Sequence, residues 1–191
     1  PLACALNALE QLEIAEGEDV LILGGGPVGL LMALAAKSLG ASPFVVEPNE
    51  AKLSAGRAFR SALRIHAGPE PISRLSDAAV NATSAPEAFV TALLRVRAAG
   101  RVCYFSGLPK DTSTPVEILN EIHYRQLRVS GAYGCTRSHL VQALGMLEEY
   151  QDAVGLLIEG EIALEQVPEA LPRIASGEAM KIVVSMGRHV D

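Results

Sequence analysis

The sequence predicts an α/β fold in which a doubly wound parallel sheet carries helices on both faces. Short apolar segments typical of buried strands alternate with helical segments over residues 1–135, and a glycine-rich turn joins the first strand to a helix that is apolar almost all round. The 191 residues, 49% apolar and 20% charged, have the composition of one globular domain with at most a small appendage. Right-handed crossovers between parallel strands then give the Rossmann arrangement.

The first part of the chain predicts a strand, a turn and a buried helix. Residues 20–23 are apolar at successive positions, as in a parallel strand covered on both faces. Pro27, which has no amide hydrogen, suits the first turn of the next helix, and Gly40 is placed to end it. A second strand is predicted at residues 44–47, followed by one helix that opens at Pro48 and extends past residue 59.

The same patterns predict the remaining elements. Further strands are predicted at residues 62–67, 77–83, 101–106, 127–132, 156–158 and 181–184. Further helices are predicted from Pro86 until Gly100 ends it, from Ser138, and over residues 164–176. The helix from Ser138 carries an apolar stripe predicted to face the core, formed by Leu140, Val141, Leu144, Met146 and Leu147.

Charge and cysteine content exclude several classes of function. Lysine and arginine number 16 against 22 aspartates and glutamates, a net charge of −6, so we expect no binding to nucleic acid or to an anionic membrane. The longest apolar run, residues 28–36, is too short to span a bilayer. The three cysteines form no CxxC pair, so we expect a cytoplasmic protein without a structural zinc cluster. The opening at Pro1 suggests a fragment.

A glycine motif follows the first predicted strand, since Gly24, Gly26 and Gly29 satisfy GxGxxG. The first glycine permits a tight turn, the second lets a pyrophosphate approach the backbone, and the third lets helix and strand pack closely. The helix that begins with Pro27 and Val28 offers a pyrophosphate the unpaired N–H groups of its first turn, from Val28 onward, and the positive end of its dipole. With a buried strand before it and a helix after it, the motif predicts a dinucleotide site rather than only a tight turn.

Glu47, which ends the second strand, indicates which dinucleotide binds. A carboxylate there can accept hydrogen bonds from both hydroxyls of the adenine ribose, whereas the 2′-phosphate of NADP would bring like charges together. At about 4 Å and an effective dielectric near 20, that repulsion is on the order of 4 kcal/mol. The predicted cofactor is therefore NAD. Lys52, one turn into the next helix, is either a second ribose contact or a solvated lysine.

Two further strand ends indicate where a nicotinamide ring would lie. Ala82 and Thr83 end the fourth predicted strand, and Ser106, Gly107 and Leu108 follow the fifth. Small residues there leave room for the ring and supply backbone partners, although such tripeptides also occur in ordinary turns.

Other chemical motifs have little support. Cys135 and His139 stand at the spacing of a metal pair, but Gly134 argues against a helix through both, so we predict no metal ligand. The sequence contains no GxSxG, HExxH or P-loop, which argues against hydrolases and nucleotidases.

Longer segments carry a family resemblance. The opening run PLACALNALEQLEIAEGEDVLILGGGPVGLLMALAAKSLGAS is followed in order by AAVNATSAPEAF, GRVCYFSG, LRVSGAYG and LEQVPEALPRIASGEAMKIVVSM. Together they resemble the junction, cofactor domain and C-terminal helix and strand of the medium-chain dehydrogenases, the relatives of zinc-dependent alcohol, sorbitol and threonine dehydrogenases. The opening PLAC is most similar to the sorbitol and threonine branch.

The resemblance implies hydride transfer between a secondary alcohol and NAD in the parent protein, with a zinc ion polarising the alcohol oxygen. It implies adenosine and pyrophosphate contacts at Gly24, Gly26, Val28, Gly29, Glu47 and Lys52, and a nicotinamide half near Thr83, Ser106, Gly107 and Leu108. The zinc ligands of the family belong to an N-terminal domain that this sequence lacks. We therefore expect zinc only in that domain, name no catalytic residue, and expect this fragment alone to be inactive.

The resemblance also implies an organisation for the chain. Residues 1–155 match the NAD-binding domain, and residues 156–191 match a C-terminal segment that returns to the catalytic domain. The sixth strand would pair across a two-fold axis in a homodimer or homotetramer. Residues 68–76 are too few for the crossover helix usual in the family. Two alternatives stay open: a non-catalytic NAD-binding or assembly module, and a zinc-free NADPH-dependent enoyl or quinone reductase, which Glu47 opposes.

Overall fold

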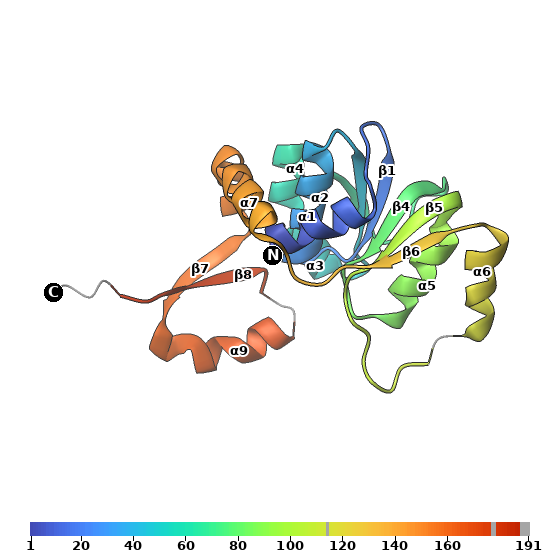
Figure 1. Ribbon diagram of the computed structural model, residues 1–191. Coiled ribbons are helices and arrows are strands. Elements are labelled where there is room, and N and C mark those ends of the chain that lie inside the picture. The colour runs from blue at the N-terminus through green and yellow to red at the C-terminus, as the bar shows by residue number, and fades with distance from the viewer. Residues whose placement is uncertain (114, 177–178, 188–191) are drawn as a thin grey trace.

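Six parallel strands form the central sheet of the computed structural model, which describes residues 1–113, 115–176 and 179–187. Their order across the sheet is β3-β2-β1-β4-β5-β6 (Figure 1). The strands are β1 (Asp19–Leu23), β2 (Ser42–Val46), β3 (His66–Gly68), β4 (Ser76–Asn81), β5 (Val96–Tyr104) and β6 (Arg128–Gly131). From β1 the chain adds β2 and β3 on one side of the sheet, and it then returns to add β4, β5 and β6 on the other side. This is the doubly wound Rossmann topology, and the predicted fold class is confirmed.

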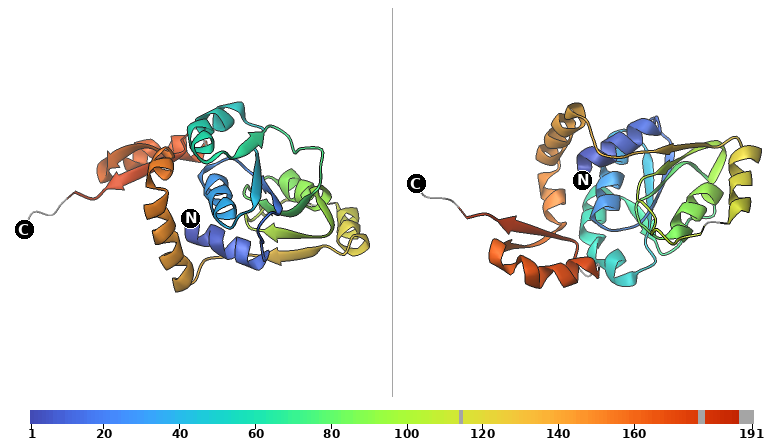
Figure 2. Two further views of the ribbon diagram at one scale, coloured as in Figure 1. Left: turned by 90° about the horizontal axis from the view of Figure 1, so that it is seen from above. Right: turned by 60° about the horizontal axis from the view of Figure 1, so that its bottom comes forward.

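Helices cover both faces of this sheet, as the views in Figure 2 show. One face is covered by α1 (Leu2–Gln11), α2 (Pro27–Ser38) and α4 (Arg57–Leu63), and the other by α5 (Pro86–Arg95) and α6 (Leu119–Tyr124), which follows η1 (Val116–Ile118). The side chains of β1 alternate accordingly, with Val20 and Ile22 in the first core and Leu21 and Leu23 in the second. No helix among the described residues is long and apolar enough to cross a membrane.

The helix predicted from Pro48 is divided into two short helices. The side chain of Asn49 caps α3 (Glu50–Ala55) by accepting a hydrogen bond from the backbone N–H of Lys52 at 3.0 Å. The second helix, α4, starts after Gly56. Since α4 continues to Leu63, the third strand begins later than predicted, at His66.

Strand β5 begins earlier than predicted. Val96, expected on the helix, already pairs with Ser76 of β4, so Gly100 lies within a strand and does not end the helix. Arg97 forms an ion pair with Asp77 in the same added region. Pairing with the neighbouring strand therefore overrides the helical pattern of this segment.

Residues 69–75 join β3 to β4 without a helix, as predicted. The segment contains Pro69 and Pro71, and its Arg74 forms an ion pair with Asp19 at the start of β1. With no crossover helix there, Phe44 of β2 is only half buried on that face of the sheet.

The core-facing stripe predicted for α7 (Arg137–Glu149) is wrong for three of its residues. Three of its side chains are exposed, Leu140 by 51%, Val141 by 63% and Leu144 by 67%. The buried residues of the helix are His139, Ala143 and Met146. The cap also differs from the prediction, because the hydroxyl of Thr136, not Ser138, accepts the hydrogen bond from the His139 backbone N–H at 3.3 Å. Contacts of His139 with α1 set the rotation of the helix, which a local apolar pattern does not reveal.

The last part of the chain forms a separate two-stranded parallel sheet beside the main one (Figure 1). Its elements are α8 (Gln151–Gly155), β7 (Ile158–Ala163), η2 (Leu164–Gln166), α9 (Val167–Ala175) and β8 (Lys181–Ser185). β7 begins where the predicted strand over residues 156–158 ends. Leu164, Leu171 and Ile174 are exposed, so this unit leaves apolar surface uncovered.

Asp77 predicts how stability depends on pH. Partial burial raises the pKa of its carboxyl, but a hydrogen bond from the Asp19 backbone N–H and the pairing with Arg97 outweigh this, and the net pKa lies below 3.8. A lowered pKa gives stability that is present above the unfolded-state pKa and is lost as the pH falls through the folded-state pKa. Near neutral pH we expect the free energy of unfolding of wild type to exceed that of Asp77→Asn by about 1 kcal/mol, and urea unfolding to show this difference shrinking as the pH falls below 3.8. A constant difference across this range would contradict the assignment.

Candidate functional site

The turn between β1 and α2 requires glycine at two positions. Gly24 has a φ of +121°, and a Cβ there would lie 2.8 Å from the backbone oxygen of Ala82. A Cβ on Gly29 would lie 1.9 Å from the backbone oxygen of Gly24. At Gly26, by contrast, no atom lies within 4 Å of an added Cβ. Two glycines of the motif therefore serve the fold, and the third lies beneath open space.

That open space lies at the start of α2. Gly26 is the N-cap of this 12-residue helix, Pro27 is its first residue, and no side chain among the described residues caps it. Val28 is half buried, and every residue from Gly29 to Ala36 is buried, which fixes the helix in place. Uncapped N–H groups and the positive end of the helix dipole favour an anion at this point.

Glu47 is held immediately after β2 by two backbone hydrogen bonds. Its Oε2 accepts from the N–H of Gly25 at 2.9 Å, and its Oε1 accepts from the N–H of Asn49 at 3.0 Å. The residue is only 8% exposed. Because each carboxylate oxygen has two lone pairs, each keeps accepting capacity for a ligand hydroxyl. The acid is thus fixed against the glycine turn rather than free at the surface.

One cleft of about 270 Å³ brings together the predicted site residues Gly24, Glu47, Lys52 and Thr83. The rest of its lining is largely apolar and consists of Leu23, Val46, Pro48, Pro69, Pro71, Ala85, Ala88 and Thr91. Two prolines of the 69–75 segment form one wall and residues of α5 form another. A narrow apolar slot with a carboxylate at its edge suits a flat heterocycle that carries a hydroxylated sugar.

Asn81, which the sequence analysis did not single out, joins the ends of β4 and β5. It is fully buried, its amide nitrogen donates to the backbone oxygens of Ser106 at 2.9 Å and Thr83 at 3.3 Å, and its amide oxygen accepts from the Phe105 N–H at 2.8 Å. A polar side chain ending an otherwise apolar strand was the available signal. This network fixes two of the segments predicted to adjoin a nicotinamide ring.

The other predicted residues lie outside the cleft. Beyond β5, Gly107 is exposed, and the backbone N–H of Leu108 donates to the Tyr104 hydroxyl at 3.0 Å. Ala82 is half buried after β4 and packs against the core. Pro27 lines a different cavity of about 180 Å³, an apolar one that also contacts the C-terminal unit. Of the residues predicted for the nicotinamide half, Thr83 lines the cleft, and the others form a row of strand ends rather than an enclosed pocket.

Comparison with known proteins finds relatives along nearly the whole chain. No protein-family model matches the chain. D-altritol 5-dehydrogenase of Agrobacterium fabrum is 29% identical over 95% of this chain and 56% of its own length. Sorbitol dehydrogenase of Bombyx mori is 26% identical over 96% of this chain and 56% of its own length. The solved structure of 2R,3R-butanediol dehydrogenase from Bacillus subtilis covers 98% of this chain and 56% of its own, with a TM-score of 0.81 and 22% identity. The chain is thus similar over nearly its whole length to medium-chain dehydrogenases/reductases.

The chain spans about half the length of the medium-chain dehydrogenases that it matches. Two further structural neighbours carry a cofactor. An alcohol dehydrogenase of Escherichia coli CFT073 is complexed with NADH, at a TM-score of 0.80 and 15% identity over 97% of this chain and 57% of its own. A zinc-binding dehydrogenase of Sinorhizobium meliloti 1021 is bound to NADP. Its TM-score is 0.77 and its sequence identity 24%, and the match covers 97% of this chain and 57% of its own. At these identities the likeness concerns the fold.

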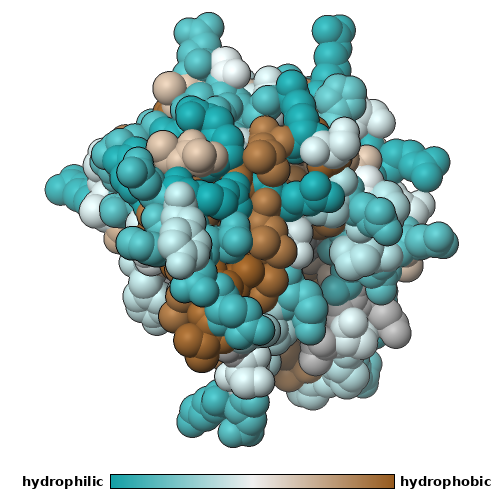
Figure 3. Space-filling model, turned by 90° about the vertical axis from the view of Figure 1, so that its right-hand side faces the viewer, coloured by the Kyte–Doolittle hydropathy of each residue, from teal (hydrophilic) through white to brown (hydrophobic). Residues whose placement is uncertain are grey.

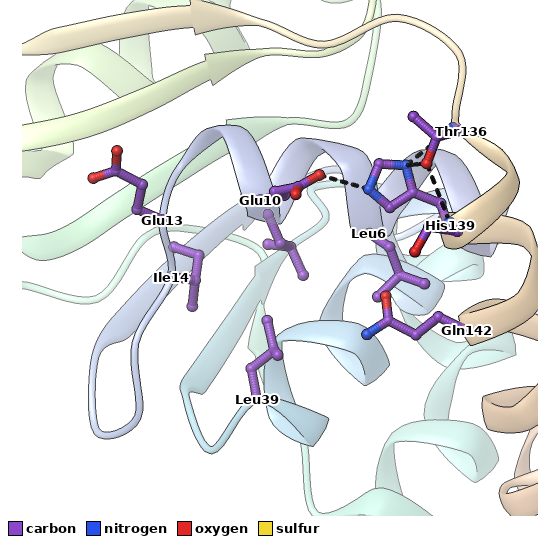
Figure 4. A pocket seen from close by; sticks show the side chains of 10 residues that line it. Leu6, Glu10, Glu13, Ile14, Leu39, Thr136, His139 and Gln142 are labelled. Atoms are coloured by element: carbon purple, nitrogen blue, oxygen red, sulfur yellow. Dashed lines mark hydrogen bonds and ion pairs between the residues drawn. The ribbon is translucent and has the colours of Figure 1, made fainter.

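His139 has a structural role in this chain. It lines a cavity of about 460 Å³ between α1 and α7 (Figure 4). Because the Thr136 backbone N–H donates to Nδ1 at 3.1 Å, the ring proton lies on Nε2, which contacts Glu10 Oε2 at 2.7 Å. Both ring nitrogens are occupied, and Cys135 lies outside the helix. Within the described ranges, no three metal-binding side chains cluster.

Proposed function

We propose that this chain is the NAD-binding unit of a zinc-dependent medium-chain dehydrogenase that transfers hydride between a secondary alcohol or polyol and NAD. The observation that carries the proposal is the open space over Gly26 at the uncapped start of α2, next to a cleft edged by Glu47. Bound NAD supplies the hydride acceptor, and the residues of this chain hold it. The medium-chain relatives, among them altritol and sorbitol dehydrogenases, support the substrate class.

The adenosine half is assigned to the cleft. Glu47 accepts the ribose hydroxyls with the lone pairs that its two backbone hydrogen bonds leave unused. Lys52 also lines the cleft and is half buried, which brings it within the same site as the ribose. The pyrophosphate lies over Gly26 and accepts from the amides at the start of α2, beginning with those of Val28 and Gly29.

The nicotinamide half is assigned to the ends of β4 and β5. Ala82, Ser106, Gly107 and Leu108 supply backbone groups for the carboxamide and leave space for the ring, because their side chains are mostly small. Thr83, which also lines the adenosine cleft, borders both halves of the cofactor. Asn81 positions this row from below through its contacts with the backbone oxygens of Thr83 and Ser106. Its role is positioning, since it is buried beneath the surface that the ring would contact.

Catalytic groups and zinc are assigned to the part of the relatives that this chain does not match. Residues 156–191 form the segment that packs against that part, which agrees with the exposed apolar side chains of α9 and β8. Residues 1–155 form the cofactor domain.

The sixth strand is assigned to an interface between two copies of the chain, in a homodimer or homotetramer. β6 lies at one end of the sheet order, so its outer edge has no neighbouring strand within the described residues. Figure 3 shows hydrophobic side chains on this side of the molecule, and the exposed apolar residues of α6, η1 and β6 include Val116, Leu119 and Val129. A second copy would pair its backbone along this edge and cover the apolar patch.

Calorimetric titration of the chain and of Gly26→Val with NAD tests the proposal. An added Cβ meets no atom within 4 Å at Gly26, so we expect the variant to fold as wild type. The same side chain occupies the space of the pyrophosphate, so we expect affinity for NAD to fall by about 100-fold, or ~2.7 kcal/mol. Circular dichroism melting checks the fold. Unchanged affinity in the folded variant would overturn the proposal, as would absence of NAD binding to wild type.

A further inference from the structure

Two of the three cysteines lie close to the point where a hydrogen bond joins α1 to the loop between β6 and α7. The side-chain amide of Asn7 on α1 donates to the backbone oxygen of Gly134, 127 positions further along the chain, at 3.2 Å. Cys4 lies one turn before Asn7 on the same helix, and Cys135 directly follows Gly134. The Cys4 thiol also contributes to raising the pKa of the Cys135 thiol, as expected of two side chains that face each other where these segments meet.

The surroundings of the three thiols differ. Cys135 is exposed in its loop, and Cys4 is half buried beside it. Cys103 lies in β5 with no exposed surface, and burial raises its pKa to about 11. Because the thiolate is the reactive form, Cys103 is protected from exchange, whereas a reagent can reach Cys135 directly.

The contact between Cys4 and Cys135 does not belong to the candidate cofactor site. Cys4 is on the helix that precedes β1, and Cys135 follows β6, the last strand of the sheet order. None of the residues that line the cleft at Glu47 comes from either segment. A covalent bond between these cysteines would therefore join α1 to the end of β6 without contact to the adenosine cleft.

We propose that Cys4 and Cys135 form an oxidisable dithiol that a small-molecule disulfide converts into an intramolecular disulfide bond. The thiolate of Cys135 attacks one sulfur of oxidised glutathione, which forms a mixed disulfide and releases one reduced glutathione. The thiolate of Cys4 then attacks the Cys135 sulfur, which forms the protein disulfide and releases a second reduced glutathione. Two protein thiols are oxidised and one glutathione disulfide is reduced, and the two thiol protons end on the two glutathione thiolates that leave.

The local electrostatics set the pH at which this exchange is fast. Loss of solvation, the charge of the neighbouring Cys4 thiolate and the hydrogen bond to Cys4 raise the pKa of Cys135. The attacking thiolate is therefore scarce near neutral pH, and we expect the rate of exchange to rise as the pH increases above neutrality. No other ionisable side chain is among the causes of that shift; the amino terminus at Pro1 opposes it.

The experiment treats the 191-residue chain with oxidised glutathione and counts free thiols, of which the sequence provides three. We expect one reactive thiol to remain after denaturation, namely Cys103, no glutathione adduct on the intact mass, and a peptide that joins residues 4 and 135 in a non-reducing digest. We expect the oxidised chain to melt about 5 °C higher than the reduced one, and dithiothreitol to reverse this, because the bond closes a long loop.

Single variants separate this dithiol from other oxidation products. Cys103→Ser should form the same disulfide, whereas Cys135→Ser and Cys4→Ser should not, and Cys4→Ser should instead retain a glutathione adduct at Cys135. If Cys4→Ser alters the fold, Cys135→Ser still tests the loss of the disulfide, because it changes an exposed side chain. A stable glutathione adduct at Cys135 of wild type, or a disulfide between two chains through Cys135, would overturn the proposal.

Discussion

Replacement of Gly29 by alanine is expected to destabilise the chain by about 4 kcal/mol, a value at the upper end for single substitutions. The new Cβ would lie 1.9 Å from the backbone oxygen of Gly24 and 3.0 Å from its carbonyl carbon. Both atoms belong to the turn itself, so no flexible side chain can move aside. The start of α2 must shift away from β1, and the buried contacts of that helix are disturbed. Urea unfolding followed by circular dichroism measures the loss.

Gly26→Ala is the matched control, since it adds the same methyl group three residues earlier in the same turn. No atom lies within 4 Å of a Cβ at Gly26, and its φ of −72° suits any residue. We expect a loss of about 1 kcal/mol or less, because alanine caps a helix less well than glycine. Equal stability of the two variants would show that the close approach of helix and strand is not what Gly29 provides.

The glycine motif serves two purposes. Gly24 and Gly29 are required by contacts within the protein, and these contacts exist without a ligand. Gly26 has no such requirement, so its lack of a side chain matters only if something else occupies the space above it. A sequence pattern alone gives the three glycines equal weight, whereas the surrounding atoms distinguish the one that reports on binding.

Much of the fold could be predicted because its signals are local. Residues 20–23, the glycine turn and the apolar helix after it specify a β-α unit by sequence alone, and repetition of such units implies the parallel sheet. The errors occur where a distant partner decides. Val96 belongs to β5 because it pairs with Ser76, and α7 turns Leu144 outward because His139 contacts Glu10 on α1. Local patterns do not contain either partner.

The candidate site shows the same division. Position and spacing identified Glu47, but not the hydrogen bonds from Gly25 and Asn49 that fix its carboxylate. Asn81 was missed because its three contacts are with strand ends that only the folded sheet brings together. The wall formed by Pro69 and Pro71 could not be predicted either, since the shortened segment specifies only that a helix is absent. Spacing predicts which residues converge, and packing determines what each of them is able to do.

The NAD preference assigned to Glu47 gives the second large expected effect. With the carboxylate held at the edge of the cleft, a 2′-phosphate at about 4 Å would meet a repulsion on the order of 4 kcal/mol, so wild type should bind NAD nearly a thousandfold more tightly than NADP. Glu47→Gln removes the charge, and we expect this preference to fall to about tenfold or less. Fluorescence titration with both cofactors measures the ratio.

Two controls separate this loss of charge from damage to the site. Glutamine keeps one acceptor oxygen but directs an amide group at the N–H of either Gly25 or Asn49, so we expect a stability loss of about 1–2 kcal/mol, which a melting curve detects. Glu50→Gln makes the same change in net charge on an exposed residue at the start of α3, outside the cleft lining, and should keep the preference. Damage to the cleft would lower the affinity for both cofactors together. Only a gain in the affinity for NADP relative to that for NAD therefore identifies repulsion by Glu47. An unchanged ratio in folded Glu47→Gln would instead mean that the sugar binds away from this acid.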